Sequence, residues 1–134
     1  MIIRIETEQT EHDLIVKEAA KILEATGKYK VFTNPGQEHN VAVGGFYPDI
    51  IITNKDSETV RFVIEVETIS SIKESEVSQW RDYAKLGATF YLLVPYSNLE
   101  TAKRLCAEGK VTASFGYYWR DEQNKINISY ENSK

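Results

Sequence analysis

Three acidic side chains lie on two neighbouring stretches whose composition predicts β-strands. Asp49 opens one stretch directly after Pro48, and Glu65 and Glu67 lie near the end of the next. Because side chains alternate along a strand, Glu65 and Glu67 are expected on one face of the sheet. Two carboxylates placed in this way repel each other unless a cation or hydrogen-bond donors compensate.

A divalent metal is one interpretation of this cluster. The run from Arg61 to Val66 is too apolar for a typical surface strand, and hard cations take carboxylate oxygens as ligands. The other interpretation is that the glutamates lie on a solvated face of the sheet or pair with Lys and Arg. The hairpin alone supports both interpretations about equally, because short motifs match often by chance.

The elements that must position these carboxylates follow from hydrophobic periodicity. A helix is expected to begin with Thr10 as its N-cap and to end at Gly27, and Ser97 is expected to cap a later helix. The other predicted elements are strands at 28–33, 47–53 and 60–68, a helix at 71–86, a strand at 89–94, a helix at 97–109 and a closing hairpin of strands at 112–119 and 125–130. This order predicts a mixed α/β sheet covered by helices, in a single domain spanning residues 1–134.

Composition restricts the class of protein. The chain has 134 residues, of which 42% are hydrophobic and 27% charged, as in ordinary globular domains. No apolar run reaches the roughly 18 residues of a transmembrane helix, and charge follows the N-terminus too early for a secretory signal. We therefore expect a soluble, cytoplasmic protein with no membrane partner. The net charge of −4 disfavours a general polyanion binder, but it is compatible with an active site built from carboxylates.

The acidic hairpin also resembles a known family. Pro48-Asp49, followed sixteen residues later by Glu65-Val66-Glu67, is similar to the motif of the PD-(D/E)xK nuclease superfamily. The resemblance covers roughly residues 10 to 119. It implies the restriction-endonuclease-like fold, a central mixed β-sheet flanked by helices in the order αβββαβα, here followed by the C-terminal hairpin. The chain departs from the family at Glu67, where most members have Lys, and Lys73 is a possible substitute.

Two further features agree with this resemblance. Gln79 and Tyr83 form a Gln-x-x-x-Tyr pattern on the helix after the motif, which resembles members of the RecB-like branch. Residues four apart share a helix face, although Tyr83 could also be a core residue. Glu18 interrupts the apolar stripe of the first helix, and several families of the superfamily place a glutamate there near the metal. The alternative is that Glu18 lies at the solvent edge of the helix and extends its carboxylate into water.

The resemblance implies Mg²⁺-dependent hydrolysis of a phosphodiester in DNA or RNA, with Mn²⁺ as a substitute. It assigns the metal to Asp49, Glu65, the backbone carbonyl of Val66 and Glu18. Glu67 would bind a second metal or act as general base, and Gln79 and Tyr83 would position water or phosphate. Arg81 and Lys85 are candidates for contacts with the nucleic-acid backbone, although a solvated helix face is the simpler interpretation of each residue alone. A homodimer is expected because small nucleases often form symmetric pairs.

Two other functions stay open at this stage. A catalytically inactive domain of the same fold could bind nucleic acid or protein, and a structural subunit could carry acidic residues unrelated to metal. Among the remaining reactive side chains, His12 and His39 are expected at the surface. Cys106 lies at an apolar helix position and is expected to be a packed core thiol.

Overall fold

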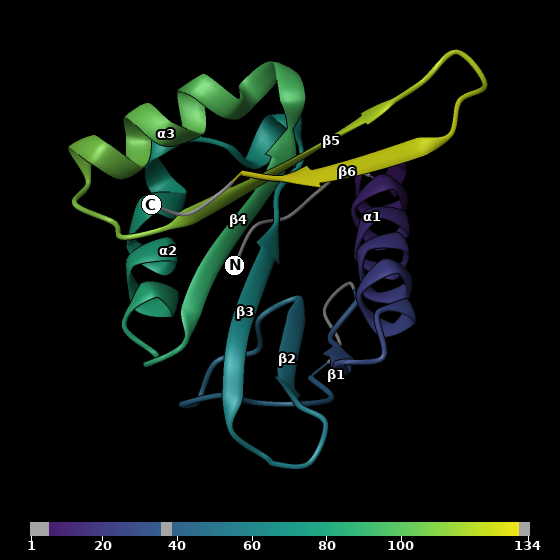
Figure 1. Cartoon of the computed structure of the whole chain (residues 1–134). Coiled ribbons are helices and arrows are strands. Elements are labelled where there is room, and N and C mark those ends of the chain that lie inside the picture. The colour runs from purple at the N-terminus through teal and green to yellow at the C-terminus, as the bar shows by residue number, and fades with distance from the viewer. Residues whose placement is uncertain (1–5, 36–38, 132–134) are drawn as a thin grey trace.

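The computed structural model describes residues 6–35 and 39–131, which form one six-stranded sheet and three α-helices (Figure 1). The helices are α1 (Glu6–Ala25), α2 (Val77–Ala84) and α3 (Leu99–Glu108). The strands are β1 (Tyr29–Thr33), β2 (Ile50–Asn54), β3 (Val60–Val66), β4 (Thr89–Pro95), β5 (Ser114–Arg120) and β6 (Ile126–Tyr130).

The strands are ordered in space as they are in the chain. The pairs β1–β2, β2–β3 and β5–β6 are antiparallel, whereas β3–β4 and β4–β5 are parallel. Parallel neighbours need a crossover connection, and the segments that contain α2 and α3 provide the two crossovers. The prediction of a mixed sheet covered by helices is therefore confirmed.

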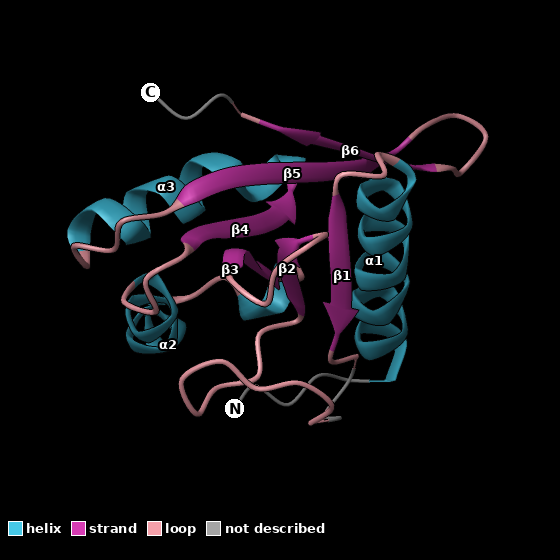
Figure 2. Ribbon diagram, turned by 60° about the horizontal axis from the view of Figure 1, so that its bottom comes forward, coloured by secondary structure: helices cyan, strands magenta, loops and turns pink. Residues whose placement is uncertain are grey.

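The helices cover opposite faces of the sheet. Figure 2 shows α1 beside β1, with α2 and α3 on the other side. Ile50 and Ile52 of β2 pack in one apolar cluster with Ile15 of α1, and Ile51 packs in another with Trp80 of α2. Because both faces are covered, three consecutive isoleucines are buried, as in the continuous apolar strands of sheets with two covered faces.

The first and last helices begin differently from the prediction. The α1 helix starts at Glu6, and the Thr10 hydroxyl donates to the Glu6 carbonyl at 3.0 Å, so Thr10 is an interior residue and not the N-cap. Acidic residues in the first turn favour this earlier start, because they complement the helix dipole. Ser97 lies in a 3₁₀ turn (Tyr96–Asn98), and Asn98 occupies the N-cap position of α3.

The predicted helix at 71–86 is shorter than expected. Two 3₁₀ turns, Ile69–Ser71 and Glu74–Glu76, precede α2. The Ser71 hydroxyl lies 3.1 Å from the Thr68 carbonyl and also donates to the Glu67 carboxylate. Such local side-chain bonds compete with helix formation, which explains why the regular helix begins six residues later than predicted.

Two further expectations concern the environment of Cys106 and the absence of a membrane-spanning helix. Cys106 is buried among core residues, and this burial raises the pKa of its thiol to about 11, so the prediction of a packed thiol is confirmed. Within residues 6–35 and 39–131, every helix is too short or too polar to cross a membrane.

Candidate functional site

Asp49 lies directly before β2, at the end of the β2–β3 ladder. The last residue pair in this ladder is Ile50 with Ile64. Asp49 Oδ2 accepts a hydrogen bond of 2.8 Å from the backbone N–H of Val66, so the carboxylate extends the ladder beyond the last backbone pair. The Asn34 amide donates to the Pro48 carbonyl at 2.7 Å and fixes the preceding residue.

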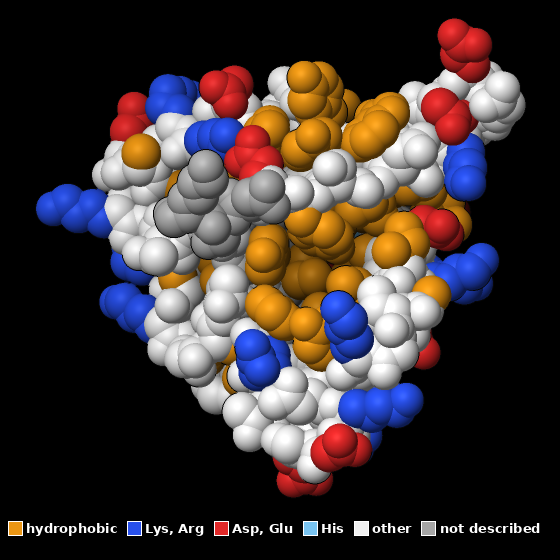
Figure 3. Space-filling model, viewed as in Figure 1, with side chains coloured by type: hydrophobic (Ala, Val, Ile, Leu, Met, Phe, Trp, Pro, Cys, Tyr) orange, Lys and Arg blue, Asp and Glu red, His pale blue; other side chains and the backbone are white. Residues whose placement is uncertain are grey.

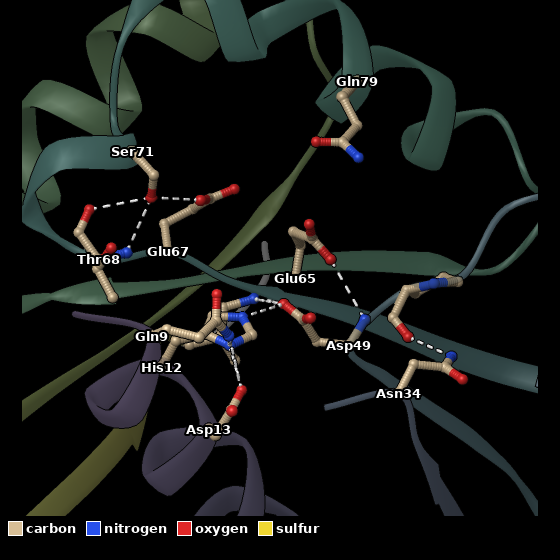
Figure 4. Close-up of polar contacts among 12 residues, drawn as sticks. Gln9, His12, Asp13, Asn34, Asp49, Glu65, Glu67, Thr68, Ser71 and Gln79 are labelled. Atoms are coloured by element: carbon tan, nitrogen blue, oxygen red, sulfur yellow. Dashed lines mark hydrogen bonds and ion pairs between the residues drawn. The ribbon is translucent and has the colours of Figure 1, made fainter. Parts of the chain in front are cut away.

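His12 reaches this carboxylate from α1. Its Nε2 lies 3.0 Å from Asp49 Oδ2, and its Nδ1 lies 3.0 Å from Asp13 Oδ1 (Figure 4). Carboxylates accept hydrogen bonds only, so both contacts are hydrogen bonds when both ring nitrogens carry a proton. Only 1% of His12 is exposed, and the prediction that it lies at the surface is therefore wrong.

The error on His12 has an identifiable cause. The sequence has no second ligand residue at metal-like spacing from His12, which favours a surface position, but helical periodicity points the other way. His12, Ile15, Val16 and Ala19 are all buried, at the spacing of one helix face. Counting back from the apolar stripe places His12 against the sheet. His39, by contrast, is exposed as predicted and stacks on Tyr47 at 4.1 Å between ring centroids.

Glu65 lies beside Asp49 on the adjacent strand. The backbone N–H of Asp49 donates to Glu65 Oε1 at 3.2 Å, and 9% of Glu65 is exposed. Burial raises the pKa of Glu65 well above its usual range, and the negative charges of Asp49 and then Glu67 raise it further. A hydrogen bond between the Asp49 and Glu65 carboxyl groups also raises this pKa, because it needs a proton. This site therefore concentrates negative charge in a place with little solvent.

Two oxygen atoms of this pair could accept a cation. Asp49 Oδ2 and Glu65 Oε1 receive the N–H donors of the surrounding described residues, whereas Asp49 Oδ1 and Glu65 Oε2 receive none of those bonds. Within residues 6–35 and 39–131, Asp49 Oδ1 and Glu65 Oε2 are not among the fully buried side-chain atoms that lack a hydrogen-bond partner. Carboxylate oxygens that lie side by side are the kind of ligand that Mg²⁺ and Mn²⁺ accept.

Glu67 has a different environment. The Ser71 hydroxyl donates to Oε1 at 2.5 Å and the Trp80 indole N–H donates to Oε2 at 2.7 Å. The backbone of Glu67 is also bonded, because its N–H donates to Leu93 and its carbonyl accepts from the Tyr118 hydroxyl. A role as second metal ligand or general base would have to use the remaining lone pairs of these two oxygens.

Gln79 and Tyr83 face the same region from α2. The Gln79 amide donates to the Tyr83 hydroxyl at 3.1 Å, and Figure 4 shows the Gln79 side chain pointing toward Glu65. Burial raises the pKa of Tyr83, and the negative charge of Glu65 is the next largest cause. Tyr83 is also part of the apolar core, so it contributes to packing as well as to the border of the site.

The other predicted residues, with the exception of Val66, lie apart from this group. Glu18 is half-buried and lies six residues after His12, which places it about 9 Å further along α1 and on another face of the helix. Arg81 donates to the Gly109 carbonyl at 2.7 and 3.1 Å and so links α2 to the end of α3. Lys73 and Lys85 are exposed, and they lie before and after α2 in the chain. Val66 is fully buried, and its N–H is bonded to Asp49.

No preformed metal centre is present in the part of the chain that the structure describes, because no three His, Cys, Asp or Glu side chains lie together in a metal-binding arrangement. No protein-family model matches the chain, and no curated protein matches its sequence. A functional assignment therefore depends on the geometry of Asp49, Glu65 and His12 and on the motif in the sequence.

Proposed function

We propose that this chain is a metal-dependent nuclease with a restriction-endonuclease-like fold. The element order of helix, three-stranded meander, helix, strand and helix supports the proposal, as does the parallel pairing of β3 with β4. The expected partner is DNA or RNA, and the protein is expected to act as a homodimer in the cytoplasm.

One observation carries the proposal. Asp49 and Glu65 place two carboxylates side by side at a buried position, and the pKa of Glu65 is raised by burial and by the neighbouring charges. A divalent cation between the carboxylates would replace the shared proton and remove the repulsion. Perturbed carboxylates in such a position are more frequent at functional sites than at structural ones.

The residues of the chain would have separate roles. Asp49 and Glu65 would hold Mg²⁺ with the help of the Val66 carbonyl, and His12 would fix the orientation of Asp49 through Oδ2. A bound Mg²⁺ would polarise the phosphate and lower the pKa of an attacking water. Gln79 would orient that water or a phosphate oxygen by hydrogen bonding. Glu67 would support the site without touching the substrate, because its carboxylate holds Ser71 and Trp80 in place.

A second candidate function is an inactive domain of the same fold that binds nucleic acid or protein. The specific observation in its favour is the engagement of both Glu67 carboxylate oxygens by Ser71 and Trp80. Most members of the superfamily have a lysine where this chain has Glu67, and here that side chain is bonded within the core. Lys73, the possible substitute, is exposed and lies six residues later in the chain. Binding of Mn²⁺ without cleavage of any nucleic acid would support this alternative.

The test combines metal binding with cleavage. Isothermal titration with Mn²⁺ and a nuclease assay on single- and double-stranded DNA and RNA would be run on the intact chain. Asp49→Asn and Glu65→Gln are expected to weaken Mn²⁺ binding at least tenfold and to abolish cleavage. Glu58→Gln, an exposed acid in the β2–β3 turn, is the matched control and should change neither. Wild-type protein that neither binds Mn²⁺ nor cleaves any of the four substrates would refute the proposal.

A further inference from the structure

The sheet has two edge strands, β1 and β6, and only one of them carries residues that prevent pairing with a further strand. On β1 the exposed Lys28 and Lys30 place charge along the edge, and Pro35 follows shortly after the strand. β6 has the sequence Ile-Asn-Ile-Ser-Tyr, without a charge or a proline. Figure 2 shows β6 at the margin of the sheet, and no described strand pairs with its outer side. β6 is therefore the edge that is open to another strand.

The backbone of β6 presents a regular set of hydrogen-bonding groups at this edge. The Glu131 N–H donates to the Phe115 carbonyl at 2.9 Å, and the Asp121 N–H donates to the Lys125 carbonyl at 3.0 Å. These bonds lie at the two ends of the β5–β6 ladder and continue its register. Because only alternate residues of an antiparallel strand bond to the neighbouring strand, three residues direct their backbone groups outward: Ile126, Ile128 and Tyr130.

The side chains of these three residues are apolar and incompletely covered. They pack against the apolar cluster that contains Ile15 of α1, yet each is only half-buried. Figure 3 shows an apolar hollow below the place that β6 occupies in Figure 1, and Tyr130 is part of its lining. A strand added to such an edge gains main-chain hydrogen bonds and side-chain contacts together.

The spacing of the outward residues makes β6 complementary to itself. A two-fold axis at Ile128 places two copies of β6 antiparallel, with Ile128 opposite its own equivalent and Ile126 of one copy opposite Tyr130 of the other. All of these residues face outward, so each opposite pair exchanges two backbone hydrogen bonds. A β-branched residue opposite an aromatic residue is also among the cross-strand pairs that favour association.

The same register brings opposite charges together. Lys125 and Glu131 flank β6 at equal distances from Ile128, so the two-fold axis places Lys125 of each copy opposite Glu131 of the other. Lys125 is exposed, and 35% of the Glu131 side chain is exposed, with Lys103 Nζ 2.9 Å from its carboxylate. A shift of the axis along the strand would lose both charge pairs. The charges therefore select one register out of several.

We propose that two copies of this chain associate through β6, as an antiparallel pair about a two-fold axis at Ile128 that joins the two sheets into one. The proposal rests on the proposed function only in specifying the surface of the expected homodimer, and it requires neither metal nor nucleic acid. A second copy is favoured over an unrelated extended peptide, because its hydrogen-bonding groups and its flanking charges both match β6 in one register. Two-fold pairs are also the commonest homo-oligomers.

The first experiment measures association and locates it. Analytical ultracentrifugation of the intact chain in EDTA, from about 1 μM to about 1 mM, should show a reversible dimer. Hydrogen exchange followed by NMR over the same range should show protection that grows with concentration at the amides of Ile126, Ile128 and Tyr130. The amides of Asn127 and Ser129 should be protected at every concentration, because they bond to β5 within one chain.

Charge substitutions test the register. Lys125→Glu places acids opposite each other twice in the dimer and should weaken association about tenfold. Glu131→Lys should have a similar effect, and the double variant restores both pairs, so its dissociation constant should return to within about threefold of the wild type. Lys28→Glu makes the same change of charge beside β1 and is the matched control, which should associate like the wild type. Thermal unfolding of each variant verifies that it folds.

Three results would overturn the proposal. The chain would sediment as a monomer throughout the series, a dimer would form without added protection at Ile126, Ile128 and Tyr130, or the double variant would associate as weakly as either single variant. An extended peptide as the true occupant of the edge would give the first result. Because the measurements are made in EDTA without nucleic acid, their failure is distinct from a failure to bind Mn²⁺ or to cleave.

Discussion

Two glutamates at the end of β3 differ more than their positions suggest. Glu65 and Glu67 are two residues apart and on the same face. Both are buried: 9% of Glu65 and 1% of Glu67 is exposed. Glu67 receives the Ser71 hydroxyl and the Trp80 indole N–H. Glu65 receives one backbone N–H, at 3.2 Å, from the described residues and lies beside the charge of Asp49.

This difference separates a structural acid from a candidate functional one. A buried carboxylate that is bonded on both oxygens is compensated in its ionised form by those donors. A buried carboxylate beside a like charge is destabilised in its ionised form until a cation or a proton arrives. The alternation of side chains places both on one face, but the donors around each decide its role.

The largest expected effect is the removal of the structural acid. Glu67→Ala leaves the Trp80 indole N–H unpaired in the core and removes one acceptor of the Ser71 hydroxyl, which still lies 3.1 Å from the Thr68 carbonyl. A buried unpaired donor costs roughly 1–3 kcal/mol. We expect a loss of about 3 kcal/mol in the free energy of unfolding, measured by urea denaturation. Glu67→Gln should lose less, because its amide oxygen still accepts one of the two bonds.

Glu67→Lys sharpens the same comparison. It introduces the residue that most members of the PD-(D/E)xK nuclease superfamily have in this motif, but it places an ammonium group opposite two hydrogen-bond donors. The variant should be at least as unstable as Glu67→Ala, and it should not gain cleavage. A stable Glu67→Lys protein with higher nuclease activity would show that Glu67 belongs to the reacting group and not to the support behind it.

The sequence predicted the contacts that follow from periodicity. Alternation in the strands and the sixteen-residue spacing of the motif brought Asp49 and Glu65 together on adjacent strands. The element order was also predictable, because long apolar runs, Gly27 and the turn residues mark the boundaries. Helix starts were the least predictable part, since the Thr10 and Ser71 hydroxyls bond to backbone carbonyls three or four residues earlier, and the sequence does not distinguish such a bond from a helix cap.

The contacts that distinguish the two glutamates are not encoded locally. Trp80 lies 13 residues beyond Glu67, and His12 lies 37 residues before Asp49, so both contacts depend on how the helices pack on the sheet. A pattern of single residues does not report which donor will meet which carboxylate. The buried helix face that contains His12 is the one signal in the sequence that identifies it.

The next effect concerns the pH dependence of stability. The folded-state pKa of Glu65 is raised, so the folded chain binds this proton more tightly than the unfolded chain does. The cost of ionising Glu65 is absent below its unfolded pKa of about 4.3 and grows as the pH rises through the folded pKa. Glu65→Gln should therefore raise the melting temperature at pH 8 and change it little at pH 4.

Calorimetry at both pH values would measure this effect, with Glu58→Gln as the exposed control. The amide oxygen introduced by Glu65→Gln would still accept the Asp49 backbone N–H, so the contact at this position is retained. Added Mn²⁺ should stabilise the wild type at pH 8 and leave Glu65→Gln unchanged. Equal destabilisation of the variant at both pH values would instead show that Glu65 is a structural acid like Glu67.

The smallest expected effect is at Glu18, the glutamate of α1 that the motif comparison linked to a metal. Glu18 lies about 9 Å further along the helix than His12, on another face, and it is half-buried. Glu18→Gln should change the free energy of unfolding by no more than about 0.5 kcal/mol, as for most surface substitutions. It should also leave the Mn²⁺ affinity of the wild type intact, which the same titration used for Asp49→Asn would measure. A loss of affinity comparable to that of Glu65→Gln would place Glu18 among the ligands and would mean that α1 turns or shifts when the metal binds.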